Sequence, residues 1–189
     1  MAAAFDLQVL TVSEPITSAK GAKTSALSYR GTTPIVWHPE AQRVAYEPSA
    51  FQNEDASRVN LVMRASPQVV DALNALDERM IELCTQQSAQ LFGKTLTQEE
   101  VALRYTPCLK KSEKGYEPTF KVKINLTGRS KLRCWNTSQE VCEAPESWVG
   151  CSAKPIVNVR CLWIMPKSFG CLLECSNVLI NEAQPQCPF

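Results

Sequence analysis

Apolar and polar residues alternate strictly in the segment TFKVKINL, residues 119–126. Phe120 and Val122 fall on one side of this segment, and Lys121 and Lys123 fall on the other. A period of two residues is that of a β-strand with one buried face. The segment therefore predicts a half-buried strand whose outer face is basic.

Further strands are predicted on both sides of this segment. The two most apolar of them, residues 155–165 and 169–180, are joined around Pro166. Residues 39–57 are polar and irregular and predict no strand. A short strand bounded by Pro34 and Pro39 is expected at a sheet edge, because proline cannot donate to a strand ladder. The expected strands are 5–12, a strand from the turn at Gly21 through Tyr29, 32–39, 59–65, 119–126, 131–135, 155–165 and 169–180.

Between Ser66 and Gly93 the apolar period changes to three or four residues, which predicts one long helix. Ser66 is a favourable N-cap, Pro67 fits the first helical position and Gly93 can end the helix. A second, short helix is predicted from Thr97, because Glu100 follows it at the capping-box spacing. The outer side of the long helix is predicted to be acidic, from Asp71, Asp77, Glu78 and Glu82.

The order of strands, helices and strands predicts the fold class. It favours a mainly β, antiparallel, closed or nearly closed barrel with a helical insertion at about residues 67–105. A length of 189 residues suits a single domain, expected over residues 1–180, with residues 181–189 as a C-terminal tail.

The chain is expected to be intracellular, in the cytoplasm or the nucleus. Its N-terminus has no basic segment and reaches Asp6 early, which does not favour a secretory signal. The nine cysteines are an odd number, so reduced thiols are expected rather than a disulfide framework. No apolar run approaches the roughly 20 residues of a membrane-spanning helix, and no membrane association is predicted.

The positive charge of the chain is concentrated in one segment. Residues 104–133 hold nine basic and two acidic residues, a net charge of +7, whereas the remainder holds 11 basic and 17 acidic residues, a net charge of −6. One interpretation is a solvated lysine-rich loop and edge strand. The other is a face that binds a polyanion, with nucleic acid as the favoured ligand.

Catalytic, cofactor and metal sites have little support in the sequence. His38 is the single histidine, and no glycine-rich phosphate-binding motif occurs. The nearest cysteine pair, Cys171 and Cys175, lies within a predicted strand and lacks the paired spacing of a zinc site. No enzyme, cofactor or metal is therefore predicted.

Single-stranded nucleic acid is bound by a positive groove in which bases stack on aromatic side chains. The basic segment interleaves both kinds of residue. For Tyr116 and Trp135 a place in the core is as well supported as a stacking role, whereas Trp163 and Phe169 are expected in the core. The candidate binding residues are Lys110, Lys111, Tyr116, Lys121, Lys123, Arg129, Lys131, Arg133 and Trp135.

The layout resembles the single-stranded-DNA-binding proteins of short-tailed coliphages and their relatives in large nucleocytoplasmic DNA viruses. The resemblance lies in KGAK (20–23), the helical insertion, KVKI (121–124), CLWIMPKSFGCLLECSNVLI (161–180) and a terminal phenylalanine. It implies an oligonucleotide/oligosaccharide-binding (OB) barrel, cooperative protection of single-stranded DNA, and a tail that contacts replication proteins. Lys20 and Lys23 are added to the candidate DNA-binding residues, and Phe189 is the candidate partner contact.

The tail departs from the family pattern, in which acidic residues precede the last aromatic one. Here NEAQPQCPF (181–189) holds only Glu182, which does not favour a tail that competes electrostatically with DNA. The predicted function is to coat and protect single-stranded DNA in replication or recombination, with a homodimer left open. The alternative is a viral structural or assembly protein with a basic binding face, and an enzyme that uses a reactive cysteine is the third.

Overall fold

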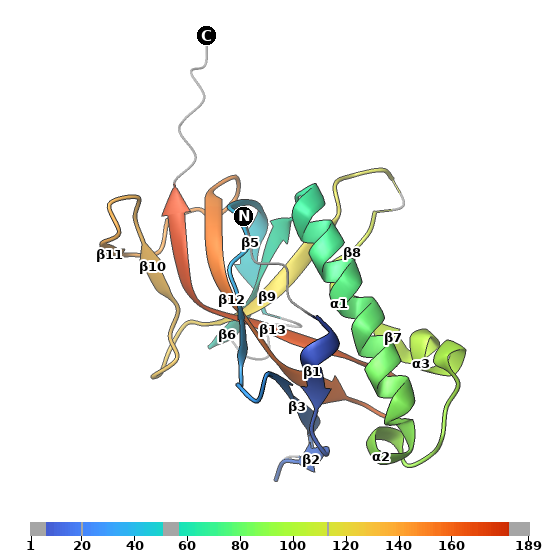
Figure 1. The fold of residues 1–189 in the computed structure, drawn as a ribbon. Coiled ribbons are helices and arrows are strands. Elements are labelled where there is room, and N and C mark those ends of the chain that lie inside the picture. The colour runs from blue at the N-terminus through green and yellow to red at the C-terminus, as the bar shows by residue number, and fades with distance from the viewer. Residues whose placement is uncertain (1–6, 20, 51–56, 113, 182–189) are drawn as a thin grey trace.

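Five strands pair into a ring in the computed structural model, which describes residues 7–19, 21–50, 57–112 and 114–181 (Figure 1). Around the ring the order is β5, β6, β9, β13 and β12, and the ring closes because β12 pairs with both β13 and β5. Their bounds are β5 (Gln42–Ser49), β6 (Arg58–Arg64), β9 (Thr119–Asn125), β12 (Ser152–Ile164) and β13 (Phe169–Asn181). The mainly β prediction is thus confirmed.

The predicted antiparallel pairing is wrong for one pair of the ring. In a ring of antiparallel pairs, each strand runs opposite to both of its neighbours. With an odd number of strands this alternation cannot close, so the ring must contain at least one parallel pair. Here that pair is β9 and β13, joined where Lys123 lies opposite Glu174. The other four pairs of the ring are antiparallel.

The remaining strands extend the ring on either side. Four N-terminal strands lie against β12 or against one another, and the other four lie against β9, β13 or one another. On its edge away from β12, β13 pairs in parallel with β7, β9 and β10 in turn. The bounds are β1 (Leu10–Val12), β2 (Ile16–Thr17), β3 (Lys23–Tyr29), β4 (Ile35–Trp37), β7 (Tyr105–Thr106), β8 (Leu109–Lys110), β10 (Arg133–Trp135) and β11 (Val141–Cys142).

Two strand predictions fail. Strand β5 lies in the segment 39–57, which predicted no strand, and its pairing with β6 is shifted on both sides of Tyr46. Such irregularities break the period of two on which recognition of a strand depends. Within residues 5–12, the described part begins with a 3-10 turn, Leu7–Val9, and only β1 is extended.

The predicted long helix is two helices, α1 (Pro67–Gln86) and α2 (Ser88–Phe92). Ser66 caps α1 as predicted, and Gly93 closes α2 with a φ of 74°. The break at Gln87 leaves Ser88 buried, and its hydroxyl accepts a hydrogen bond of 3.1 Å from the Leu96 backbone N–H. The predicted second helix is α3 (Gln98–Arg104), and its Thr97–Glu100 capping box is confirmed.

Helix α1 runs beside the sheet, and α2 and α3 lie near its C-terminal end (Figure 1). The apolar stripe of α1 is buried, and it belongs to the same hydrophobic core as the inward-facing side chains of the ring strands. Phe169 at the start of β13 joins the two parts, because its ring centroid lies 5.1 Å from that of Phe92 and 5.2 Å from that of Tyr105. The ring of strands and the helices therefore share one hydrophobic core.

Asp77 corrects the prediction of a uniformly acidic outer side on α1, since it is only 8% exposed. Its carboxylate accepts hydrogen bonds from the Tyr105 hydroxyl at 2.7 Å and the Cys108 backbone N–H at 2.9 Å. Burial raises the pKa of Asp77, and the hydrogen bonds from Cys108 and Tyr105 oppose that rise. The sequence holds a signal for this position, because Asp77 lies four residues after Leu73 and three before Met80, both in the apolar stripe.

The eight cysteines of the described residues are free, and none is exposed. Burial raises the pKa of Cys84 and of Cys175 to about 12, and that of Cys134 to about 11. Thiolate is the reactive form of cysteine, so these three thiols are poor nucleophiles near neutral pH.

Tyr105→Phe is expected to lower the free energy of unfolding by about 2 kcal/mol at neutral pH, because a buried carboxylate loses a donor. Loss of this hydrogen bond also raises the pKa of Asp77 further. A raised folded-state pKa makes stability fall as pH rises from the unfolded-state pKa through the folded-state pKa, so the defect should be smaller at acidic pH than at neutral pH, because lowering the pH protonates Asp77. Denaturant unfolding at both pH values tests this, with exposed Tyr116→Phe as the control. An equal loss at both pH values would contradict the prediction.

Candidate nucleic-acid interface

The outer face of β6 and β9 is polar and cationic, because inward and outward side chains alternate along both strands. Val59, Leu61 and Met63 of β6 are buried, as are Phe120, Val122 and Ile124 of β9. The antiparallel register places Lys121 opposite Val62 and Lys123 opposite Asn60. The predicted basic outer side of residues 119–125 is therefore confirmed by the alternation.

The structure brings the lysines of β9 to the same side of the sheet as Lys131, which precedes β10, and Arg133, which begins β10. Asn125 at the end of β9 forms a parallel bridge with Lys131, so Lys131 shares the outer side of Lys123. Arg133 lies opposite Asn177, three residues after Glu174 on the same edge of β13. We give the name basic face to six of the outward cations on these strands and their neighbours: Arg58, Lys121, Lys123, Lys131, Arg133 and Arg160.

One carboxylate, Glu174, lies within this face, and sequence reasoning missed it. It accepts hydrogen bonds from Arg58 and, at 3.1 Å, from Arg160, both of which also form ion pairs with it. Glu174 lies about forty residues beyond the basic segment in sequence, within one of the two most apolar predicted strands. Only the parallel pairing of β9 and β13 brings it to Lys123.

Tyr46 is a second residue that the sequence did not indicate. It is 63% exposed and lies opposite Val62, which in turn lies opposite Lys121. Side chains opposite one another across paired strands share a face of the sheet. A solvent-exposed aromatic ring therefore stands in line with a lysine of the basic face.

The two predicted stacking residues differ in their surroundings. Trp135 is half-buried, and its indole N–H donates a hydrogen bond of 3.0 Å to the Asn177 side-chain oxygen. Tyr116 is 72% exposed in the segment between β8 and β9. Trp135 is consequently anchored in the sheet, whereas Tyr116 is not packed.

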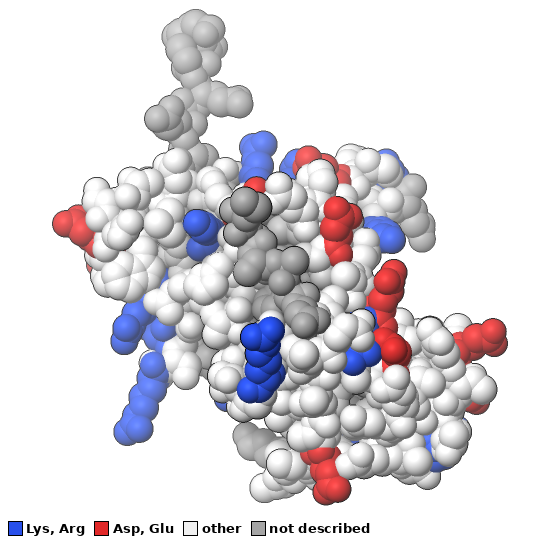
Figure 2. All heavy atoms as spheres, viewed as in Figure 1, with Lys and Arg blue, Asp and Glu red and all other residues white. Residues whose placement is uncertain are grey.

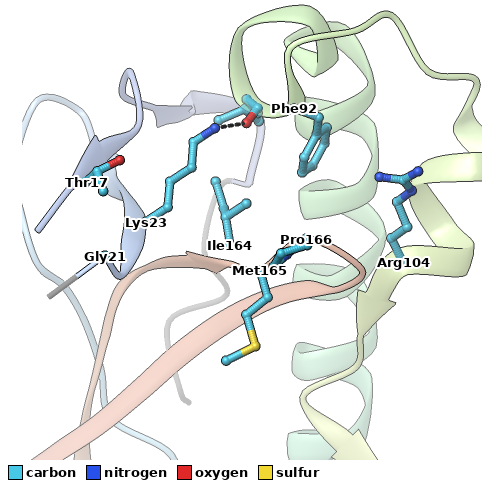
Figure 3. Close-up of a pocket in the computed structure, with 9 residues that line it drawn as sticks. Thr17, Gly21, Lys23, Phe92, Arg104, Ile164, Met165 and Pro166 are labelled. Carbon is cyan, nitrogen blue, oxygen red and sulfur yellow. Dashed lines mark hydrogen bonds between the residues drawn. The ribbon is translucent and has the colours of Figure 1, made fainter.

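The other predicted cations lie in several places. Lys110 is exposed on β8 opposite Thr119, and Lys111 and Arg129 are exposed in connections. Lys23 is not brought to the basic face: its ammonium group donates a hydrogen bond of 2.7 Å to the Leu91 carbonyl of α2. It lines a hollow of about 320 Å³ together with Phe92, Arg104 and Ile164 (Figure 3). Lys20 and Phe189 lie outside the described residues.

Cations and acids are unevenly distributed over the molecule. In Figure 2, Lys and Arg project near β10 and the connection that precedes it, and Asp and Glu follow α1 and α3, although acids also lie near β11 and cations beside α1. The exposed helical acids are Asp71, Glu78, Glu82, Glu99 and Glu100. A near-neutral chain thus carries a local excess of acids on its helices.

Within the ranges that the structure describes, no group of three or more His, Cys, Asp or Glu side chains is arranged to hold a metal ion. No helix in that part of the chain has the length and apolar character needed to cross a membrane.

The fold is shared with solved structures of phage single-stranded-DNA-binding proteins. That of bacteriophage Enc34 in complex with ssDNA is 12% identical, with a TM-score of 0.51 over 92% of this chain and 97% of that chain. A second structure of the single-stranded DNA-binding protein from bacteriophage Enc34 is 12% identical, with a TM-score of 0.51 over 94% of each chain. The single-stranded DNA binding protein gp2.5 of bacteriophage T7 is 14% identical, with a TM-score of 0.49 over 82% of this chain and 94% of that chain. No model of a known protein family matches the chain, and no curated protein matches it.

Trp135→Ala is expected to lower the free energy of unfolding by about 1–3 kcal/mol, because it removes a half-buried ring and leaves the Asn177 side chain without its donor. Chemical denaturation measures the change. Tyr116→Ala is the matched control, and as a surface change it should stay within about 0.5 kcal/mol of the parent. If Trp135→Ala is as stable as the parent, the ring is not anchored and a free stacking platform becomes the better interpretation.

Proposed function

We propose that this protein binds single-stranded DNA across the basic face. The observation that carries the proposal is the row Tyr46, Val62 and Lys121, which joins an exposed aromatic ring to the cations of β9 on one surface. Phosphates are neutralised by lysine and arginine, and unpaired bases stack on aromatic rings. The combination suits a single strand better than a duplex, whose bases are already stacked.

The arrangement of the ring supports an OB-type barrel. An OB barrel is a five-stranded, partly open barrel in which the second and third strands and two loops bind oligonucleotides. Counted from β5, the second and third strands in the chain order of this ring are β6 and β9. Their outward side chains belong to the basic face. The likeness of fold to the single-stranded DNA-binding protein from bacteriophage Enc34 supports the proposed ligand.

The biological role follows as part of the same proposal. A protein of this kind would coat and protect single-stranded DNA during replication or recombination, without catalysing a reaction. Residues 181–189, with Phe189 at the end, are proposed to contact replication proteins, and a reducing intracellular compartment is proposed from the odd number of cysteines. A homodimer stays an open alternative to a monomer.

Changing Lys121 and Lys123 together to Glu should weaken binding to all oligonucleotide sequences and flatten the salt dependence. Each phosphate contact that is lost reduces the slope of log affinity against log salt by about 0.7 for a single strand. Fluorescence anisotropy with single-stranded DNA at several salt concentrations measures both quantities. If the double variant binds like the parent, the basic face is not the binding surface.

The same titration separates the ligand classes. Lys94→Glu, at an exposed position after α2, is the control for single Lys121→Glu, and it should change affinity much less. Double-stranded DNA and single-stranded RNA are titrated alongside. Equal binding to duplex DNA would favour a structural or assembly protein that meets the packaged genome.

Tyr46→Ala should lower the affinity for single-stranded DNA by about 1–3 kcal/mol if one base stacks on the ring. Tyr46→Phe keeps the ring and should bind like the parent. Both variants should unfold like the parent, because the side chain is exposed. Oligonucleotide titration combined with denaturation checks the prediction, and unchanged affinity of Tyr46→Ala would remove the stacking role.

A further inference from the structure

Glu174 is the feature of the basic face that phosphate binding alone does not explain. Its side chain is 17% exposed, and its two carboxylate oxygens are divided between two arginines. Arg58 on β6 bonds to Oε1, and Arg160 on β12 bonds to Oε2. One acid therefore connects cations from two strands at the centre of a surface proposed to bind a polyanion.

A third cation, Lys123, is the cross-strand neighbour of this carboxylate, in addition to the two arginines that pair with it. The local net charge is thus +2 rather than +3. Each carboxylate oxygen occupies the position on an arginine that a phosphate oxygen would take, and its charge repels a phosphate that approaches. Glu174 consequently weakens the attraction of the surface for any polyanion.

Both arginines stay accessible to a second ligand, because their side chains are 38% and 63% exposed. An arginine has five N–H donors in a fixed fork, and one nitrogen of each guanidinium group meets Glu174. The buried Nε of Arg58 has no hydrogen-bond partner among the described residues. The position of Arg58 therefore depends on its ion pair with Glu174, because its Nε makes no hydrogen bond that would help to hold it.

We propose that Glu174 positions Arg58 and Arg160 and competes with DNA phosphates for them, so that it limits the affinity and the salt dependence of binding. The inference rests on the proposed function. A DNA phosphate can bind the same nitrogens of the two guanidinium groups only if their ion pairs with Glu174 break. Part of the free energy of each such phosphate contact is therefore offset by the loss of an existing ion pair. A surface built in this way holds a strand less tightly than its count of cations implies.

Glu174→Gln removes the charge and keeps the shape and one acceptor oxygen. Its affinity for single-stranded DNA should rise on the order of five-fold at low salt, because one negative charge leaves the contact surface. The slope of log affinity against log salt should steepen by up to about 0.7 for each phosphate contact that is gained. Anisotropy titrations over a range of salt concentrations give both values.

The matched control is Glu82→Gln, which makes the same change to a glutamate that also pairs with an arginine. Glu82 lies on α1, and its Oε2 is 2.6 Å from Arg79. A general effect of net charge would appear in both variants, whereas competition within the basic face appears only in Glu174→Gln. Equal affinity and slope in the two variants, or weaker binding by folded Glu174→Gln, would overturn the proposal.

A second variant keeps the test open if Glu174→Gln fails to fold. Arg160→Gln changes an exposed residue that already shares its charge with Glu174, so it should lower affinity less than Lys121→Gln does. An equal or larger loss would contradict competition. The titration of the parent protein precedes these comparisons: if the parent does not bind single-stranded DNA, the proposed function itself fails, and that outcome is distinct from any result with the variants.

Discussion

The closure of five strands into one ring is the constraint on which the rest of the structure depends. Because five is odd, one pair must be parallel, and β9 and β13 form it at Lys123 and Glu174. The same edge of β13 then receives β10. Cations from two separate strands thereby reach one surface, and a carboxylate from a third strand comes to lie among them.

Local patterns predicted the parts of the fold that local interactions determine. The alternation in residues 119–125 reflects direct contact of every second side chain with the core, and the Thr97–Glu100 capping box is complete within four residues. Strand β5 was missed because its irregular register hides the period of two. Asp77 was misplaced because its burial is made possible by donors from Tyr105 and Cys108, about thirty residues away.

The candidate site likewise contains residues that the sequence predicted and residues that only long-range strand pairing brings there. The basic side of β9 follows from sequence alone, since strand geometry fixes the direction of Lys121 and Lys123 relative to the core. Tyr46 and Glu174 joined the site only through pairing between distant strands. Lys23 was predicted to belong to the site, but its ammonium group instead donates a hydrogen bond to a backbone carbonyl of α2 that is distant in sequence. The charged residues of a sequence can be counted, but the topology of the fold decides which residues lie beside them.

The clustering of cations in residues 104–133 also has a consequence before any contact is made. That segment has a net charge of +7 and the remainder of the chain has −6, and a nearby polyanion exerts a torque on a charge distribution that is uneven. If the protein binds single-stranded DNA as proposed, orientations in which the basic face leads are favoured while the two molecules are still separated by water. Rotation during approach then raises the fraction of collisions that are productive, and dissolved salt shortens the range over which this orientation acts.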